Sequence, residues 1–178
     1  VEQKGSLVNE KNLRFDFSHF QKVTEEELEK IEDLVNNAIR QNHRFEEDRS
    51  CTIEDAKSKG AMALFGEKYG DKVRVVKFGD SVELCGGTHV SSTAQIGKFI
   101  FITETAVAAG IRRIEAITSI KADEYINNEL SLLNDVRVLF KNPKNLTKHL
   151  EGLLRQNSDL QKEIDKLLKD KAKNLKSE

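Results

Sequence analysis

The first hydrophobic pattern along the chain is a strict alternation. Residues 13–18 read Leu-Arg-Phe-Asp-Phe-Ser, so every second residue is apolar, which predicts a half-buried strand with one polar face. The apolar positions between residues 28 and 39 fall on one helical stripe instead. Thr24 and Glu27 precede that stripe at the spacing of a capping box. The pattern therefore predicts a strand followed by a helix that packs on a sheet.

The middle of the chain is predicted to hold one short helix and several short strands. The helix is expected over 53–59 and ends at Gly60, and a turn is expected over 66–70. Segments that are mostly rich in β-branched or aromatic residues, separated by connections that contain glycine, predict strands over 73–78, 81–84, 98–104 and 111–118. Because helices and strands mix without a repeating βαβ order, we predict an α+β fold on a largely antiparallel sheet packed with helices.

The C-terminal part of the chain has a helical pattern throughout. Apolar residues keep helical spacing from 126 to 140, and the only proline, Pro143, then breaks it within 142–145. From Leu146 the apolar residues step by threes and fours for about three heptads, which predicts a coiled-coil extension. Asn157 at one seam position is either solvated or a buried polar residue that sets the register.

These patterns together predict the organisation of the chain. We expect a folded domain over 1–120, a linker helix and turn over 121–145, and a coiled-coil helix over 146–178. The chain starts at Val1 rather than methionine, so we also expect it to be a piece of a longer protein.

Composition and charge narrow the possible partners. Of the 178 residues, 38% are hydrophobic and 33% are charged, which is polar for a packed globule and fits a solvated C-terminal helix. The 29 basic residues nearly balance the 30 acidic ones, so any RNA contact must come from local patches or from domains outside this chain. The longest apolar runs have the length of strands rather than the ~20 residues of a membrane span, so no membrane partner is expected.

The two cysteines, Cys51 and Cys85, lie far apart in a chain without a hydrophobic signal segment. This favours free or metal-bound thiols in a cytoplasmic protein over a disulfide framework. Cys85 and His89 are separated by three residues, and a thiolate and an imidazole at that spacing can reach one tetrahedral zinc ion if the turn is tight. Gly86 and Gly87 permit a tight turn, because glycine can adopt positive φ.

Spacing alone gives weak support for zinc, because two ligands do not hold the ion. No second closely spaced pair occurs in the chain. His19 and His43 are expected to be surface or capping imidazoles, His149 lies on the coiled-coil helix, and Cys51 is expected to be a buried or half-exposed structural thiol. If a zinc site exists, its other ligands lie outside this chain.

Five segments, in the same order, closely resemble the editing domain of alanyl-tRNA synthetase. They are 3–8 (Gln-Lys-Gly-Ser-Leu-Val), 14–19 (Arg-Phe-Asp-Phe-Ser-His), 60–70 (Gly-Ala-Met-Ala-Leu-Phe-Gly-Glu-Lys-Tyr-Gly), 83–89 (Glu-Leu-Cys-Gly-Gly-Thr-His) and 109–116 (Ala-Gly-Ile-Arg-Arg-Ile-Glu-Ala). The resemblance extends from Val1 to about Ser119. The helices that follow resemble the start of that enzyme's C-terminal region, which contacts tRNA and dimerises.

The resemblance implies a zinc site that this chain contains only in part. The family takes two histidines from an H-x-x-x-H helix and a cysteine and a histidine from a C-x-x-x-H turn. The second pair falls on Cys85 and His89, and the first belongs upstream of Gln3, outside this chain. We therefore expect zinc in the intact enzyme, weak or absent zinc in this chain, and no activity of this chain alone. The family also places the glutamine at Gln3 in the editing pocket.

The implied reaction is hydrolysis of the ester that joins a wrongly attached serine or glycine to tRNA(Ala). The parent enzyme ligates alanine to tRNA(Ala) with ATP, and its ATP and Mg²⁺ belong to an aminoacylation domain outside this chain. Zinc could activate the water, polarise the carbonyl or orient the substrate, and we favour the last two roles. The expected partners are the acceptor end of tRNA(Ala) and a second copy, through the coiled coil.

Four further side chains are candidates for roles at this site. Thr88 offers a hydroxyl beside the metal turn, either for catalysis or to stabilise the turn. Arg112 and Arg113 point to opposite faces of their strand, so one can face the tRNA while the other is solvated or paired with Glu115. Asp16 could support the pocket or pair with Arg14, and we favour the pair.

Other hypotheses stay open at this point. Segment 60–70 lacks the spacing of a phosphate loop and is expected to shape the pocket wall. A free-standing trans-editing deacylase shares the five segments, although the long helical tail favours the multidomain synthetase. A non-catalytic tRNA-binding or dimerisation fragment is the alternative from another class. A small structural zinc module is disfavoured, because no second ligand pair completes four ligands.

Overall fold

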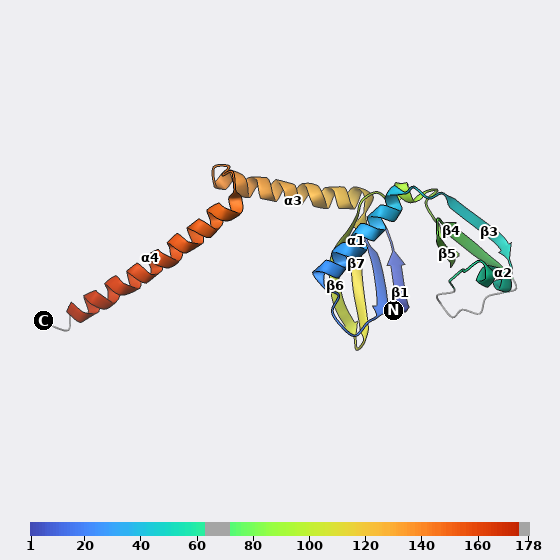
Figure 1. Ribbon diagram of the computed structural model, residues 1–178, viewed down its shortest axis with the longest axis horizontal. Helices are drawn as coiled ribbons and strands as arrows, with labels where there is room; N and C mark the ends of the chain where they lie inside the picture. Colours follow the sequence, from blue (N-terminus) through green and yellow to red (C-terminus); the bar gives the residue numbers. More distant parts are fainter. Residues whose placement is uncertain (63–71, 175–178) are drawn as a thin grey trace. The chain divides into compact units, whose positions relative to one another are not determined.

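The computed structural model describes residues 1–62 and 72–174. It forms two compact units, Val1–Ile126 and Asn127–Glu178. The elements are β1 (Gln3–Val8), β2 (Leu13–Ser18), α1 (Glu25–Arg40), β3 (Phe45–Cys51), α2 (Ile53–Ser58), β4 (Val73–Phe78), β5 (Ser81–Leu84), the 3-10 helix η1 (Thr93–Ile96), β6 (Phe99–Ala108), β7 (Ile111–Thr118), α3 (Ser119–Leu139) and α4 (Leu146–Asn174) (Figure 1). The turn predicted over 66–70, and most of the pocket wall predicted over 60–70, lie outside the described residues.

The strands form two antiparallel sheets in the first unit. One has four strands in the order β1-β2-β7-β6, and the other has three in the order β3-β4-β5. The predicted α+β class and antiparallel pairing are thereby confirmed. The prediction of a single sheet is wrong, because alternation shows that a segment is extended but not which segment it pairs with.

The four-stranded sheet is built around the alternating segment that the sequence predicts. In β2, Phe17 is buried, and the strand pairs with β7 so that Asp16 stands opposite Arg113. Ala116 of β7 and Phe99 of β6 pack with Ile39 of α1 in one apolar core. Burial of these apolar side chains fixes the register, since a slip of one residue would turn the apolar face to solvent.

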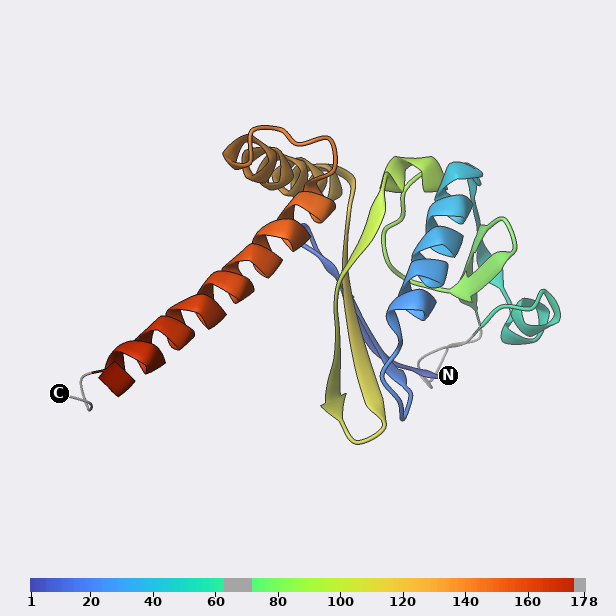
Figure 2. The same ribbon diagram turned by 60° about the vertical axis from the view of Figure 1, so that its left-hand side comes forward.

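Helix α1 begins at the predicted capping box. The Glu27 backbone N–H donates to the Thr24 hydroxyl at 3.2 Å, and the Glu27 carboxylate accepts from the Thr24 N–H at 2.8 Å. Figure 2 shows α1 alongside the four-stranded sheet, with η1 near its C-terminal end. There the buried Thr93 hydroxyl donates to the carbonyls of Ala38 and Ile39.

Helix α1 is also fastened to the edge strand β6 by polar side chains. Asn36 is 3% exposed, and its amide accepts from the Phe99 N–H and donates to the Phe99 carbonyl, both at 2.9 Å. One turn earlier, the Glu32 carboxylate accepts from the Phe101 N–H at 3.0 Å. The outer edge of β6 is therefore paired with side chains of α1 at the start of the strand, at Phe99 and Phe101.

The three-stranded sheet has a separate apolar core. Val73 and Val75 of β4 and Leu84 of β5 pack with Cys51 and with Ala56 of α2. Thr52 caps α2, as its hydroxyl accepts from the Asp55 N–H at 3.1 Å. Strands β1 and β3 are absent from the sequence-based prediction. Both are largely exposed, so neither carries the apolar alternation by which strands are recognised.

The second unit is helical, as predicted. Lys141 and Asn142 both have positive φ, 58° and 53°, and with Pro143 they separate α3 from α4. In α4 the seam residues Leu160 and Leu167 are 58% and 62% exposed, and the coiled coil stays a prediction. In the described ranges no helix has the length and apolar character needed to cross a membrane.

Candidate functional site

The turn that carries Cys85 and His89 directly follows β5. Leu84 is buried, and the Cys85 N–H extends the pairing with β4 by donating to the Arg74 carbonyl at 3.3 Å. Cys85 is half-buried, whereas residues 86–89 are exposed. The glycines do not adopt the positive φ that we expected, since the described glycines with positive φ are Gly60, Gly79, Gly97 and Gly110. The segment is held in place for another reason.

That reason is Arg74, a residue of β4 that the sequence analysis missed. Its Nη1 atom donates to the carbonyls of Cys85 and Gly87, at 3.0 and 2.5 Å. Its Nε atom donates to Glu47 of β3 at 2.8 Å. Inside the turn, the Gly87 N–H points at the Cys85 Sγ atom, 3.4 Å away. One guanidinium thus connects the turn to two strands of the sheet.

The imidazole of His89 rests on aromatic side chains. It stacks on Phe45 with ring centroids 5.7 Å apart and lies 6.0 Å from the ring of Phe78. Partial burial lowers the pKa of His89, and the positive charge of Arg74 lowers it further, while Glu83 and Glu47 oppose both effects. A lowered pKa favours the neutral imidazole, which is the form that binds metals.

The donor set of this turn fits half of a zinc site. A thiolate sulfur and a neutral imidazole nitrogen are the ligands that structural and catalytic zinc sites use. Among the described residues, no group of three or more His, Cys, Asp or Glu side chains is placed to hold a metal ion. By their chemistry, Cys85 and His89 could supply two of the four ligands of such a site, and Thr88 stands exposed between Gly87 and His89.

The other predicted site residues lie on the four-stranded sheet. Gln3 begins β1, opposite Phe17, and its amide donates to the Ser6 hydroxyl at 3.0 Å. Asp16 is the partner of Arg113, with two nitrogen–oxygen distances of 2.7 and 2.8 Å. Arg14 is farther from Asp16, at 4.0 Å. The pairing of Asp16 with Arg14 is thus secondary to its pairing with Arg113.

The two adjacent arginines of β7 have different partners. Arg113 pairs with Asp16 of β2, and Glu115 is only a more distant negative charge that raises its pKa slightly further. Arg112 binds both carboxylate oxygens of Glu104 on β6, whose side chain is 2% exposed. Because Arg112 is 13% exposed and Arg113 is 29% exposed, Arg113 is the more accessible of the two.

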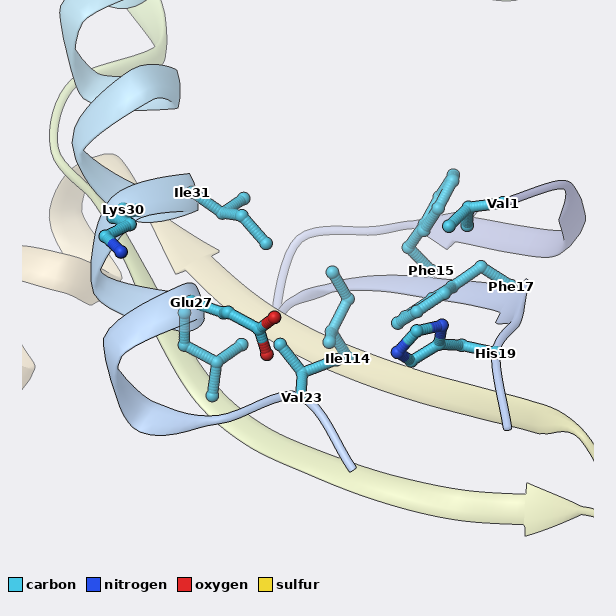
Figure 3. Close-up of a pocket in the computed structure, with 10 residues that line it drawn as sticks. Val1, Phe15, Phe17, His19, Val23, Glu27, Lys30, Ile31 and Ile114 are labelled. Carbon is cyan, nitrogen blue, oxygen red and sulfur yellow. The ribbon is translucent and has the colours of Figure 1, made fainter. Parts of the chain in front are cut away.

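An apolar hollow lies on the same sheet, beside the start of α1. It measures about 450 Å³ and is lined mainly by Phe15, Phe17, Ile31 and Ile114. Figure 3 shows His19 next to Phe17 at one side of it, with ring centroids 6.3 Å apart. Cys85 and His89 do not line this hollow. The hollow offers an apolar surface, and the two candidate metal ligands lie outside it.

The structure does not join the predicted residues into one site. Cys85, Thr88 and His89 belong to the three-stranded sheet, whereas Gln3, Asp16 and the two arginines belong to the other one. In residues 1–62 and 72–174 no hydrogen bond or ion pair connects the two groups. Sequence reasoning missed Glu47 and Arg74, although a lone arginine within the apolar Val-Arg-Val-Val run of β4 was a usable signal.

Comparisons with known proteins identify sequences that this chain resembles. Residues 73–115, which include Arg74 and the Cys85–His89 turn, match the family described as "Threonyl and Alanyl tRNA synthetase second additional domain". The alanine–tRNA ligase of Cytophaga hutchinsonii is 55% identical over 97% of this chain. Those of Parabacteroides distasonis and Christiangramia forsetii are 49% and 52% identical over 100% and 99% of it. In each case the match covers 20% of the relative, so the chain spans about one fifth of their length.

Proposed function

Since this chain matches a segment of alanyl-tRNA synthetase over nearly its whole length, we propose that it forms part of an editing site that hydrolyses mischarged tRNA(Ala). The scissile bond is the ester between serine or glycine and the terminal adenosine. The parent enzyme in this proposal ligates alanine to tRNA(Ala) in the cytoplasm, with ATP and Mg²⁺ bound in another domain. The observation that carries the proposal is the Cys85–His89 turn, held by Arg74 inside the matched segment.

The need for such a site follows from the limits of binding. A pocket separates amino acids that differ by one methylene, or that add a hydroxyl, by only about 10- to 200-fold. A synthetase that accepts alanine therefore also activates glycine and serine at a low rate. A second site that hydrolyses the wrong esters restores accuracy.

In the proposed site, Cys85 and His89 hold zinc together with two histidines that the family carries upstream. When bound, zinc supplies a Lewis acid that can polarise the ester carbonyl or orient the substrate. The neutral His89 imidazole is ready to act as a ligand, because its lowered pKa keeps it unprotonated near neutral pH. Thr88 places a hydroxyl next to this ligand, where it can donate to a substrate oxygen.

The four-stranded sheet supplies the polar groups for the acceptor end of the tRNA. Arg113 uses two N–H groups on Asp16, and an arginine has five N–H donors in all. Its remaining donors can bind a phosphate or a ribose hydroxyl, with Asp16 fixing the plane of the guanidinium. Gln3, two strands away on β1, presents an amide that can contact the substrate.

A second proposal concerns self-association. Leu153, Leu160 and Leu167 of α4 are exposed along one predicted seam, which favours pairing with a second copy of the chain through a coiled coil. If the chain only binds tRNA or dimerises, it keeps the exposed seam of α4 and takes no part in hydrolysis of the ester. If the chain belongs to a free-standing deacylase, it hydrolyses the ester without an attached aminoacylation domain.

Deacylation of Ser-tRNA(Ala) tests the main proposal. A longer protein that includes the upstream segment should release serine, and Cys85→Ala or His89→Ala in that protein should abolish the release. Metal analysis should find stoichiometric zinc in the longer protein and little in this chain. A longer protein that folds and leaves the ester intact would contradict the editing function. Equal zinc in both proteins would contradict the ligand set.

A further inference from the structure

Arg74 occupies a central position between the sheet and the metal turn. Its side chain is 22% exposed, and it forms an ion pair with Glu47, which is 28% exposed, at 2.8 Å. Its guanidinium carbon lies 5.8 Å from the centre of the Phe45 ring, a distance at which a cation is attracted to the ring. Phe45 and Glu47 both belong to β3, so this strand contacts the arginine through two side chains.

The same phenyl ring also supports the imidazole. His89 stacks on Phe45 at an interplanar angle of 20°, and Arg74 contacts Phe45 as well. One aromatic side chain therefore fixes the position of a proposed zinc ligand and that of the arginine. Phe45 is the first residue of β3. Its N–H donates to the carbonyl of Ser91, which follows the turn in the sequence, at 3.0 Å.

The turn needs such support because of its composition. Gly86 and Gly87 have no side chain that restricts their backbone, so an unsupported Cys-Gly-Gly turn would sample many conformations. A Cβ atom at Gly86 would meet nothing within 4 Å, so packing around that residue does not restrict it either. The two hydrogen bonds from Arg74 to the carbonyls of Cys85 and Gly87 hold the peptide planes that precede and follow the Gly86-Gly87 pair.

We infer that Arg74, held by Glu47 and Phe45, is the positioning residue that sets the geometry of the Cys85 and His89 ligands. This inference rests on the proposed function, because it concerns the metal that the two ligands would share. Arg74 does not touch the substrate in this scheme. It acts through the backbone of the turn, as outer-shell partners do when they orient metal ligands.

A purely structural ion pair would behave differently. Loss of a structural Glu47–Arg74 pair would lower the stability of the three-stranded sheet and leave the metal affinity of the folded protein unchanged. A positioning residue changes the metal site of a protein that is still folded. The experiment should therefore keep the charge at residue 74 and measure the geometry of the two ligands.

Arg74→Lys is the decisive variant, since lysine keeps the charge but not the planar fork of donors. It should be made in the synthetase-length protein, with Arg49→Lys as the matched control. Arg49 also pairs with Glu47, at 3.1 Å, but its side chain is 74% exposed and points to solvent. Glu47→Gln is a milder second variant, because it weakens the anchor and leaves Arg74 in place.

Three measurements separate the outcomes. Zinc affinity, from competition with a chelator, should fall by about 10- to 100-fold in Arg74→Lys, the usual effect of losing an outer-shell partner. The visible spectrum of the cobalt-substituted protein should change, since it reports the ligand geometry. Release of serine from Ser-tRNA(Ala) should show a lower kcat with a nearly unchanged KM. Glu47→Gln should change all three in the same direction and less, and Arg49→Lys should match wild type.

Wild-type affinity, spectrum and kcat in a folded Arg74→Lys protein would overturn the positioning role and leave the proposed function standing. Loss of zinc in Arg49→Lys to the same degree would overturn it too, because that residue does not reach the turn. A wild-type protein with neither zinc nor activity would overturn the proposed function and this inference together. In this chain without metal, the NMR order parameters of the Gly86 and Gly87 backbone should be lower in Arg74→Lys, and unchanged order parameters would also count against the role.

Discussion

Asp16 and Arg113 stand directly opposite each other on β2 and β7, with both carboxylate oxygens bound by the guanidinium at 2.7 and 2.8 Å. This hydrogen bonding is the largest cause of the lowered pKa of Asp16, and the charges of Arg113 and Arg14 add to it against the effect of burial. The pair joins two strands that are distant in sequence. It therefore links the second segment of the family resemblance, on β2, to the last one, on β7.

Acid should weaken this link. The folded pKa of Asp16 lies below the unfolded value of about 3.9, so the pair contributes its full stability above that value and loses it as the pH falls through the folded pKa. The free energy of unfolding of wild type should therefore fall more steeply below about pH 4 than that of Asp16→Asn. Urea denaturation over an acid pH series measures both slopes. Asp80→Asn, at an exposed position, is the control, and equal slopes in wild type and Asp16→Asn would contradict the prediction.

Asn36→Ala should destabilise the first unit. The change leaves the N–H and carbonyl of Phe99 without the partners that Asn36 supplies, and each unpaired buried group costs about 1–3 kcal/mol. We expect a loss of about 2–4 kcal/mol in the free energy of unfolding, measured with urea. Asn37→Ala, one residue along and exposed, should change it by less than about 0.5 kcal/mol. Similar losses in the two variants would show that the contact to β6 is unimportant.

Thr24→Ala should cost about 1 kcal/mol by removing the N-terminal cap of α1. Thermal or urea unfolding of the chain measures this loss. Thr24→Ser keeps the hydroxyl that accepts from the Glu27 N–H, so it should recover most of the stability. If serine is as damaging as alanine, the hydroxyl is not the cause of the effect.

Lysines in the seam of α4 should abolish self-association. Leu160 and Leu167 are exposed in the single chain, and a charge at both positions cannot be buried between two helices without a large desolvation penalty. Sedimentation should show a concentration-dependent dimer for wild type and a monomer for the Leu160→Lys, Leu167→Lys protein. Gly152→Lys with Ser158→Lys adds the same charge at exposed positions away from the seam and should still dimerise. A monomeric wild type would rule out pairing through α4.

Local signals in the sequence predict much of the fold. The alternation over 13–18, the capping box at Thr24, the valine-rich run over 73–78 and the break at Pro143 all mark elements that the structure confirms. Each of these signals involves residues close in sequence, where spacing determines which side chains share a face. These elements could therefore be predicted without any knowledge of their partners.

The pairing of strands and the support of the site could not be predicted in this way. Strand β3 reads Phe-Glu-Glu-Asp-Arg-Ser-Cys, and a charged, exposed strand has no alternation to detect. Arg74 and Glu47 meet because β3 and β4 pair, and that contact depends on long-range register. The same holds for Arg113, whose partner Asp16 is 97 residues away.

The attachment of α1 to β6 has a consequence for the behaviour of the protein at high concentration. An open edge strand is a template on which another chain can add a strand, and proteins limit this route to aggregation by covering or charging the edge. Asn36 and Glu32 occupy the N–H and carbonyl of Phe99 and the N–H of Phe101, so intermolecular strand addition is blocked at the start of β6. The opposite edge, β1, carries Lys4, and a charged side chain on an edge strand also opposes the addition of another strand.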